Sequence, residues 1–461
     1  MARGRTLDMT QGRILPVMLQ FMIPFMLGQL FQHLYSLADM TIAGYTLGDH
    51  ALASISATTA LVTLINTTAM GFNTGNAIPM AQAFGAGDWD RTRRCFAGMA
   101  ELCVALIVLF TAVLLCVLDP LLRLVRTPAD LMADARGYVV ILILGLCATM
   151  LYNMLAGAFR ALGNSRVPLF FLICSSILNV VLDLVFLIPL HMGVRGAALA
   201  TVVAQGISAV LSGIYLYKNY PQLRLRREDF RTNRALLGKM LPLGISAALT
   251  NSLFAIGDIA VQGALNTLGR DAIIAQAAAR KITGFCIIPS IGVASTCATF
   301  TAQNYGAGQL KRIDRGLKVA NLFSLACNVV TYTLVFVFGS AIIRLVTNTD
   351  SAAVVENGTL MLRIVVAFIF TQTIVMTYRM SVQSMNRKLI PLLGTGIELL
   401  SRCFCALVLT PTIGFLGICF AEPLSWVVSG AAMVFCYIRV MGREKRLQNE
   451  GAAEPEQAKR S

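Results

Sequence analysis

Long runs of apolar residues, separated by short polar segments, dominate this chain of 461 residues. Most runs are long enough to cross the hydrocarbon core of a bilayer as a helix, which takes about 20 residues. The pattern predicts an all-α integral membrane protein with twelve transmembrane helices. The expected spans are residues 14–44, 51–84, 94–118, 135–160, 166–190, 193–218, 236–266, 271–303, 315–346, 355–383, 390–412 and 414–440.

The same layout occurs twice along the chain. Residues 81–87 read Ala-Gln-Ala-Phe-Gly-Ala-Gly, and about 220 residues later residues 302–308 read Ala-Gln-Asn-Tyr-Gly-Ala-Gly. Further pairs at a similar offset are Pro24 with Pro242, Pro168 with Pro391, and the Gly-x-x-Gly segments 193–196 and 414–417. Six spans per half is an even number, so both halves enter the membrane from the same side and form parallel repeats. We therefore expect two six-helix lobes around a central cleft.

The duplication and the polar segments together predict four regions. They are an N-lobe of six helices at 1–217, a basic cytoplasmic linker at 218–239, a C-lobe of six helices at 240–441, and a disordered cytoplasmic tail at 442–461. The tail is rich in charged residues and lacks aromatic ones, which favours disorder. The first apolar run follows a basic N-terminus without a small-residue cleavage site, so we interpret it as an uncleaved signal anchor.

Composition and charge support a membrane protein and indicate its orientation. The chain is 56% hydrophobic and only 13% charged, whereas soluble domains carry about 25% charged residues. The net charge of +15 does not indicate nucleic-acid binding, because the basic residues lie in alternate loops and do not share one face. Most of the 38 Lys and Arg residues fall on the side that carries both termini, which predicts that both are cytoplasmic. The twelve cysteines are scattered singly and predict neither disulfides nor a zinc site.

Two carboxylates lie inside predicted spans, where an ionisable side chain costs about 2.5–3.5 kcal/mol on insertion scales. Asp39 is in the first span, and Asp183 is in the fifth, one helical turn after Asn179. Counting residues from the membrane surface places Asp39, Asp183 and Thr201 at a similar depth in the outer half of the bilayer. We expect these three side chains and Asn179 to converge in the N-lobe.

A cluster of this kind has two chemical uses. Two carboxylates in a dry pocket repel each other, so one of them can take up and release a proton. Alternatively, carboxylate, amide and hydroxyl oxygens can coordinate a sodium ion. Either event changes the local charge and can bias a bendable helix between two packings. A structural role, in which the two carboxylates bond to neighbouring backbone, is the alternative.

The C-lobe carries charged residues at related places. Asp258 follows Pro242 at nearly the spacing at which Asp39 follows Pro24, and Glu422 lies at the level of Thr201 in the first repeat. Both carboxylates are candidates for lining a cavity that attracts cations.

Other charged residues of the C-lobe have simpler or open roles. Glu398 and Arg402 are four residues apart, which predicts an ion pair within one helix. Arg280 and Lys281 lie within the eighth span, and their role is open.

Several motifs resemble those of the multidrug and toxic compound extrusion (MATE) family, over about residues 8–442. Residues 32–39 read Gln-His-Leu-Tyr-Ser-Leu-Ala-Asp, and the Ala-Gln-x-aromatic-Gly-Ala-Gly turn occurs in both halves. Residues 160–163 (Arg-Ala-Leu-Gly) precede the fifth span with its Asn-Val-Val-Leu-Asp segment. NorM-like members carry a Glu in the seventh span, and residues 251–255 have none. The resemblance therefore favours the prokaryotic, DinF-like branch.

The resemblance implies two lobes of six helices and a secondary active transporter that exports organic cations or other amphipathic compounds by alternating access. Inward flow of protons or sodium would drive export. The residues that match the family's N-lobe cation site, and that would be the metal ligands if sodium is the coupling ion, are Asp39, Asn179, Asp183 and Thr201. Positions expected to line the same cavity are Gln32, Tyr35, Tyr138 and Asn153.

This assignment sets expectations for partners and location. We expect no cofactor besides the coupling ion, small organic cations or amphipathic drugs as substrates, contact with membrane lipids, and a monomer in the bacterial plasma (inner) membrane. The alternative is a flippase of lipid-linked oligosaccharides or peptidoglycan precursors, from the same superfamily. Such proteins hold a diphosphate in a cationic cavity, whereas the candidate cavity residues here are mainly acidic or neutral. The loops are too short and too poor in catalytic residue types for an enzyme.

Overall fold

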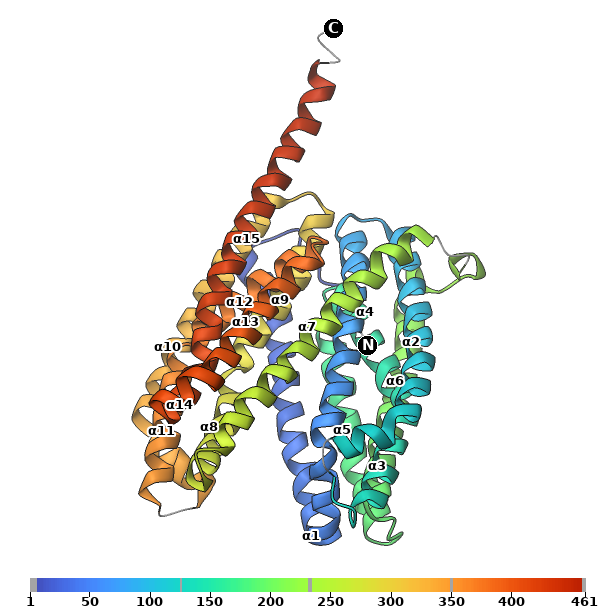
Figure 1. Cartoon of the computed structure of the whole chain (residues 1–461). Coiled ribbons are helices and arrows are strands. Elements are labelled where there is room, and N and C mark those ends of the chain that lie inside the picture. Colours follow the sequence, from blue (N-terminus) through green and yellow to red (C-terminus); the bar gives the residue numbers. More distant parts are fainter. Residues whose placement is uncertain (1–5, 125–126, 231–233, 349–350, 458–461) are drawn as a thin grey trace. The chain divides into compact units, whose positions relative to one another are not determined.

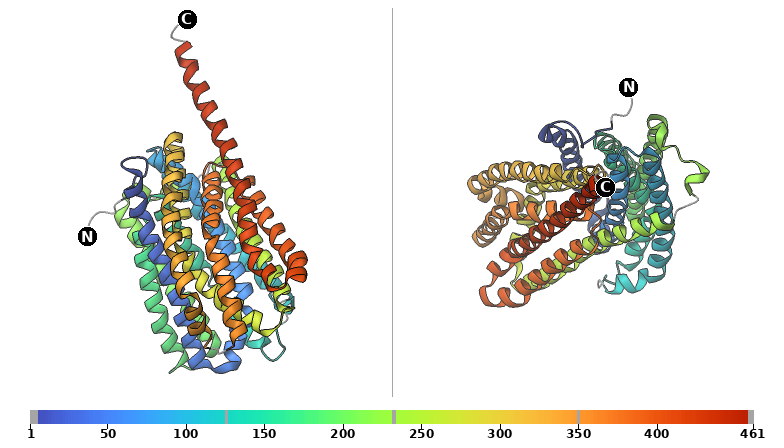
Figure 2. Two further views of the ribbon diagram at one scale, coloured as in Figure 1. Left: turned by 90° about the vertical axis from the view of Figure 1, so that its left-hand side faces the viewer. Right: turned by 90° about the horizontal axis from the view of Figure 1, so that it is seen from above.

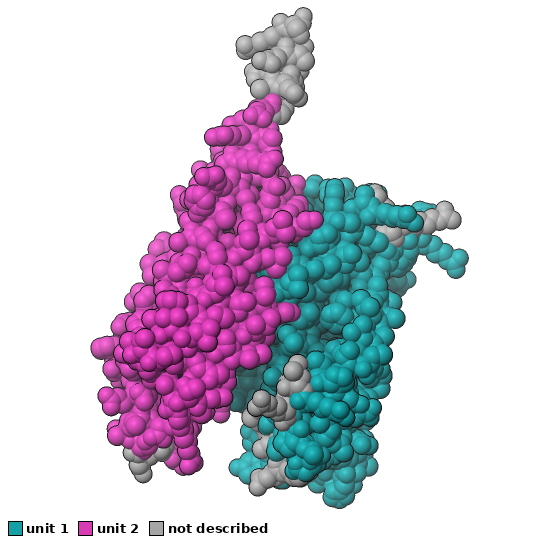
Figure 3. All heavy atoms as spheres, in the orientation of Figure 1, with its two compact units in different colours: residues 1–8, 23–251 teal, residues 9–22, 252–461 magenta. Residues whose placement is uncertain are grey.

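The computed structural model describes residues 6–124, 127–230, 234–348 and 351–457, and it is built from helices throughout these ranges (Figure 1). The chain divides into two compact units, coloured separately in Figure 3. Unit 1 comprises Met1–Asp8 and Ile23–Asn251, and unit 2 comprises Met9–Met22 and Ser252–Ser461. Two of the three crossings between the units lie within helices, after Met22 and after Asn251, the third follows Asp8, and none lies in the basic segment 218–239.

Unit 1 is a bundle of helices that run alongside one another (Figures 1 and 2). Its elements are α1 (Ile14–Gly85) from Ile23 onward, α2 (Trp89–Leu124), α3 (Met132–Leu144), α4 (Leu146–Ala161), α5 (Arg166–Leu187), α6 (Gly193–Asn219), the short turns η1 (Pro221–Leu223) and η2 (Arg227–Phe230), and the first part of α7 (Arg234–Asn266). α1 contains two predicted spans, which meet at Gly48 with φ 75° and ψ 175°. Glycine adopts this positive φ without the strain that a Cβ would cause.

Unit 2 is the second helical bundle. Its elements are the first residues of α1, the rest of α7, α8 (Arg270–Cys286), α9 (Ile288–Gly306), α10 (Leu310–Thr347), α11 (Ala352–Ala367), α12 (Ile369–Ser384), α13 (Leu389–Phe404), η3 (Cys405–Leu409), α14 (Thr410–Ile413) and α15 (Phe415–Gln457). Its apolar core includes Met361, Leu362 and Trp426, which are almost completely buried.

The helices confirm the all-α membrane fold, and their number agrees with the twelve predicted spans. Nine helices or helix segments of the described chain are long and apolar enough to cross a membrane. Three bent pairs bring the number to twelve if each pair is one span: α3 with α4 and α8 with α9 at 44°, and α11 with α12 at 43°. The protein is therefore a multi-pass membrane protein.

Close contact between two helices explains why the first part of α7 belongs to unit 1. A Cβ at Gly75 would lie 2.3 Å from the carbonyl oxygen of Leu243, and one at Gly71 would lie 2.7 Å from that of Ala247. Small residues allow membrane helices to approach this closely. The side-chain amide of Asn251 also donates to the carbonyl oxygen of Thr67 at 3.0 Å.

The segment after Gly442 differs from the predicted disordered tail, because α15 continues as a helix to Gln457. Side chains of this extension bond to unit 2. Glu444 accepts hydrogen bonds from Tyr305, at 3.1 Å, and from Arg387. Lys445 pairs with Asp314, and Gln448 donates to the carbonyl oxygen of Gly308 at 2.8 Å. The prediction of disorder rested on polar composition alone, which does not reveal bonding partners that are distant in the sequence.

Candidate functional site

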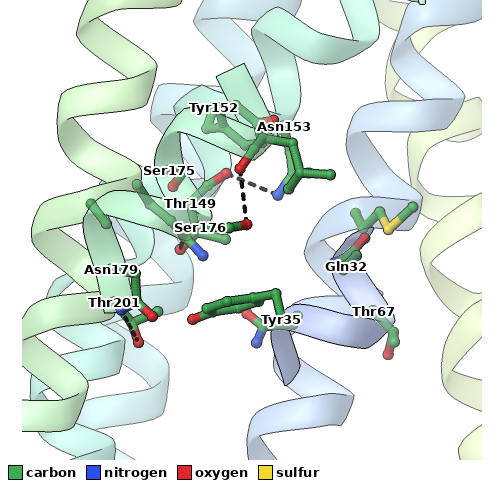
Figure 4. Close-up of a pocket in the computed structure, with 15 residues that line it drawn as sticks. Gln32, Tyr35, Thr67, Thr149, Tyr152, Asn153, Ser175, Ser176, Asn179 and Thr201 are labelled. Carbon is green, nitrogen blue, oxygen red and sulfur yellow. Dashed lines mark hydrogen bonds between the residues drawn. The ribbon is translucent and has the colours of Figure 1, made fainter. Parts of the chain in front are cut away.

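The strongest candidate site lies within unit 1, where α1, α5 and α6 bring four of the predicted residues together. Asn179 and Asp183 lie one turn apart on α5 and are 2% and 1% exposed. Thr201 faces them from α6, and its hydroxyl oxygen lies 3.4 Å from the side-chain amide group of Asn179 (Figure 4). Asp39 lies on α1 and is partly buried.

Asn179 connects the cluster by hydrogen bonds. The amide orientation that satisfies its surroundings donates to the Tyr35 hydroxyl at 2.7 Å and to Oδ2 of Asp183 at 3.1 Å. In the same orientation the Asn179 oxygen accepts from the backbone N–H of Thr201 at 3.0 Å. The Tyr35 hydroxyl also bonds to the side chain of Thr201. Residues from α1, α5 and α6 are thereby held in one network.

The two carboxyl groups of the cluster lie within hydrogen-bonding reach of each other. Neither Asp39 nor Asp183 forms an ion pair with a Lys or Arg of the described chain. Oδ1 of Asp183 is buried and receives no hydrogen bond from any described residue. Two carboxylates this close repel each other unless a proton or a cation lies between them. The arrangement therefore suits the binding of one positive charge.

A cavity of about 230 Å³ adjoins the cluster. Its lining residues are Gln32, Tyr35, Asn66, Thr67, Met70, Thr149, Tyr152, Asn153, Leu172, Ser175, Ser176, Asn179, Thr201, Ala204 and Gln205 (Figure 4). Amide and hydroxyl groups dominate this lining, which includes no acidic or basic side chain. Tyr35, Asn179 and Thr201 belong to both the cavity wall and the carboxylate cluster.

Several polar residues of this wall, such as Thr149 and Gln205, were not among the predicted site residues. Thr149 donates to the Gln205 side chain, and Asn153, a predicted cavity residue, donates to the carbonyl oxygen of Thr149 at 2.9 Å. A pattern in the sequence could have found them, because polar residues recur one turn apart in three spans. The pairs are Thr149 with Asn153, Ser175 with Asn179, and Thr201 with Gln205.

The remaining predicted site residues lie elsewhere. Tyr138 on α3 lies near Asp39 and Asp183 but is not among the cavity-lining residues. Asp258 and Glu422 lie in unit 2, on α7 and α15.

In unit 2 the carboxylates are paired with arginines. Oδ1 of Asp258 accepts from Arg280 at 2.9 Å and from Arg402 at 2.8 Å. The same nitrogen of Arg280, Nη2, lies 3.4 Å from Oε1 of Glu422. Arg280, whose role was open, is thus the link between the two acidic residues.

The predicted ion pair between Glu398 and Arg402 is wrong. Glu398 instead accepts from Arg379 of α12 at 2.9 Å and from Ser429 of α15 at 3.1 Å. Arg402 points to Asp258 of α7. The spacing rule for one helix failed because partners on neighbouring helices compete for both side chains.

Comparison with known proteins identifies relatives along most of the chain. The family model MatE matches residues 24–185 and 246–408. The probable multidrug resistance protein YpnP of Bacillus subtilis (strain 168) is 27% identical over 359 residues, which cover 76% of this chain and 78% of YpnP. The multidrug export protein MepA of Staphylococcus haemolyticus (strain JCSC1435) is 22% identical over 347 residues, 75% of this chain and 76% of MepA.

Solved structures show the same fold. One of them is described as the outward-facing conformation of a multidrug resistance MATE family transporter of the MOP superfamily. It superimposes with a TM-score of 0.88 at 22% identity, and covers 97% of this chain and 100% of its own.

Proposed function

The chain belongs to the MatE family of membrane transporters, and from this premise we propose that it is a secondary active multidrug efflux transporter. It exports organic cations and other amphipathic compounds in exchange for protons or sodium ions, by alternating access. The distribution of Lys and Arg between loops supports an orientation with both termini in the cytoplasm of a bacterial cell.

The observation that carries this proposal is the contact between the Asp39 and Asp183 carboxyl groups. Asp183 is 1% exposed and has no ion-pair partner among the described residues. A buried pair of acids without a base costs free energy unless a positive charge from solution binds to it. Exchange of this charge between the two sides of the membrane supplies the driving force for export.

The donor set suits either of the two coupling ions. A proton can bridge the two carboxyl groups directly. A sodium ion would be bound by oxygens of Asp39, Asp183, Asn179 and Thr201, and the unpaired buried Oδ1 of Asp183 fits that role. In both cases the same residues form the cation-coupling site.

The residues shared between cluster and cavity offer a route for coupling. Tyr35, Asn179 and Thr201 bond within the cluster and also line the cavity. A cation that changes their hydrogen bonds changes the surface that a substrate meets. Binding of cation and substrate is thereby linked, as antiport requires.

Transport in proteoliposomes tests this function. The purified protein would be reconstituted, and uptake of ethidium followed under a pH gradient without sodium and then under a sodium gradient. We expect one gradient to drive ethidium movement, and Asp183→Asn to abolish it. Arg136→Gln is the matched control, because Arg136 forms an exposed pair with Asp119 and does not line the cavity. Ethidium movement under neither gradient would contradict the proposal and favour the flippase alternative.

A further inference from the structure

Unit 2 contains a charged network that the cation-coupling proposal does not use. Asp258 of α7, Arg280 of α8, Arg402 of α13 and Glu422 of α15 form it. We propose that this network is a binding site for zwitterionic substrates, which carry a carboxylate and an amine or iminium group on one molecule. The inference rests on the proposed function and adds a substrate class to it.

Part of the network is accessible. The side chains of Arg280 and Asp258 are 36% and 43% exposed, whereas those of Arg402 and Glu422 are 8% and 19% exposed. All four residues lie within helices that qualify as membrane spans or as part of one. A charged side chain facing lipid at this depth costs several kcal/mol, so the exposed atoms of Arg280 and Asp258 face water. A dissolved substrate can therefore reach them.

Hydrogen-bond donors and acceptors of this network remain without a partner among the described residues. Arg280 uses only Nη2 for its bonds to Asp258 and Glu422, and no described residue accepts from its Nε or Nη1. Asp258 binds both arginines through Oδ1, and Glu422 binds Arg280 through Oε1. Oδ2 and Oε2 of these acids receive no hydrogen bond from the described residues. Free donors and free acceptors thus lie side by side.

The charge balance selects the ligand class. Two arginines and two carboxylates sum to zero, so a ligand with a net charge leaves one charge uncompensated beside the mostly buried side chains of Arg402 and Glu422. A zwitterion keeps the balance, because its carboxylate meets the free N–H groups of Arg280 and its cationic group meets the free oxygens of Asp258 and Glu422. Planar guanidinium groups match carboxylates well.

Arg402 acts as a positioning residue for this site. It is nearly buried, it holds Asp258 at 2.8 Å, and its guanidinium lies 5.7 Å from the ring centre of Phe254. Asp258 therefore keeps a fixed partner when a substrate approaches Arg280. The pre-oriented carboxylate reduces the cost of ordering the site on binding.

A matched pair of dyes tests the inference. Tetramethylrhodamine with a free carboxylate is a zwitterion, and its ethyl ester is a cation of nearly the same shape. Binding of both dyes to the purified full-length protein in detergent would be measured by fluorescence polarisation. Wild type, Arg280→Gln, Glu422→Gln and the control Arg136→Gln are compared by the ratio of the two dissociation constants, which does not depend on the folded fraction.

The two variants should change this ratio in opposite directions. Arg280→Gln leaves the site with net charge −1, so we expect the preference for the free acid over the ester to fall about tenfold. Glu422→Gln leaves it with net charge +1, so the preference for the free acid should rise. An unchanged ratio in both variants, or a change in the same direction, would overturn the zwitterion site. Absence of binding of either dye to wild type would contradict the multidrug function itself, and this inference with it.

Discussion

The two halves of the chain place polar residues at matching positions but balance their charge differently. The matching pairs are Asp39 with Asp258 shortly after a proline, Asn179 with Arg402 at the same distance from the starts of α5 and α13, and Thr201 with Glu422 at the same distance from a Gly-x-x-Gly segment. In unit 1 the carboxylates have amide, hydroxyl and carboxyl neighbours. In unit 2 each acid of the network is bonded to an arginine.

This difference indicates where an exchangeable cation binds. Asp39 and Asp183 of unit 1 lack a permanent counter-charge among the described residues, so a positive charge must come from solution. In unit 2 the side chains of Arg280, Arg379 and Arg402 supply it permanently. A duplicated layout has thus diverged into one half that binds a mobile cation and another in which the cations are part of the chain.

The largest expected effect is on stability, and it comes from removing a buried arginine of unit 2. Arg379 and Glu398 form an ion pair with exposed fractions of 3% and 2%. Arg379→Ala leaves Glu398 buried without its ion-pair partner, and we expect it to destabilise the protein by about 3–5 kcal/mol. Unfolding followed by circular dichroism in detergent measures this change. The double variant Arg379→Met with Glu398→Leu should recover most of the lost free energy of unfolding. If Arg379→Ala were as stable as wild type, the positive charge of Arg379 would not stabilise the fold.

The next prediction concerns a variant that places an arginine in unit 1, at the position matching an arginine of unit 2. Asn179→Arg places a guanidinium beside Asp183, at the position that Arg402 occupies in the other half. A tethered cation should replace the mobile one, and gradient-driven dye transport should fall roughly 100-fold. Asn179→Gln, which keeps an amide, is the matched control. Gradient-driven transport by Asn179→Arg at the wild-type rate would remove the distinction between the two halves.

A smaller effect is expected at Thr201, which contributes one hydroxyl oxygen to the cluster. Thr201→Val keeps the shape of the side chain and removes this oxygen, so the cation concentration for half-maximal transport should rise about three- to tenfold. Thr201→Ser keeps the hydroxyl and should restore the wild-type value. If Thr201→Val and Thr201→Ser needed the same cation concentration for half-maximal transport, the hydroxyl would not contact the cation.

The fold was largely predictable because lipid imposes a simple rule on the sequence. Every span must be long and apolar, and a repeated motif shows the duplication. The boundary between the two units after Asn251 was not predictable from hydropathy, because close packing of Gly71 and Gly75 against the first part of α7 determines it. The helical extension of α15 was missed for a similar reason, since its partners Asp314 and Arg387 are distant in sequence.

The candidate site was predictable in part. Carboxylates inside spans are rare enough to identify Asp39 and Asp183, and the expected depth of Thr201 placed it near them. The partners of charged residues in unit 2 were harder to predict. Glu398 and Arg402 satisfy the rule for a pair within one helix, yet each bonds to another helix. Neutral polar residues carry no comparable cost in a span. Gln32, Tyr35 and Asn153 of the cavity wall were therefore expected only from the family resemblance, whereas Gln205 emerged only from the structure.

Direct measurement of cation binding tests the central claim that only unit 1 holds an exchangeable cation. The purified protein would be titrated with sodium and, separately, with acid, and the number of bound cations per chain determined for wild type, Asp183→Asn and Glu422→Gln. For the ion that drives transport, we predict that one cation per chain binds to wild type and to Glu422→Gln, and that none binds to the corresponding site of Asp183→Asn. A cation that persists in Asp183→Asn but disappears in Glu422→Gln would place the exchangeable charge in unit 2 and contradict this account.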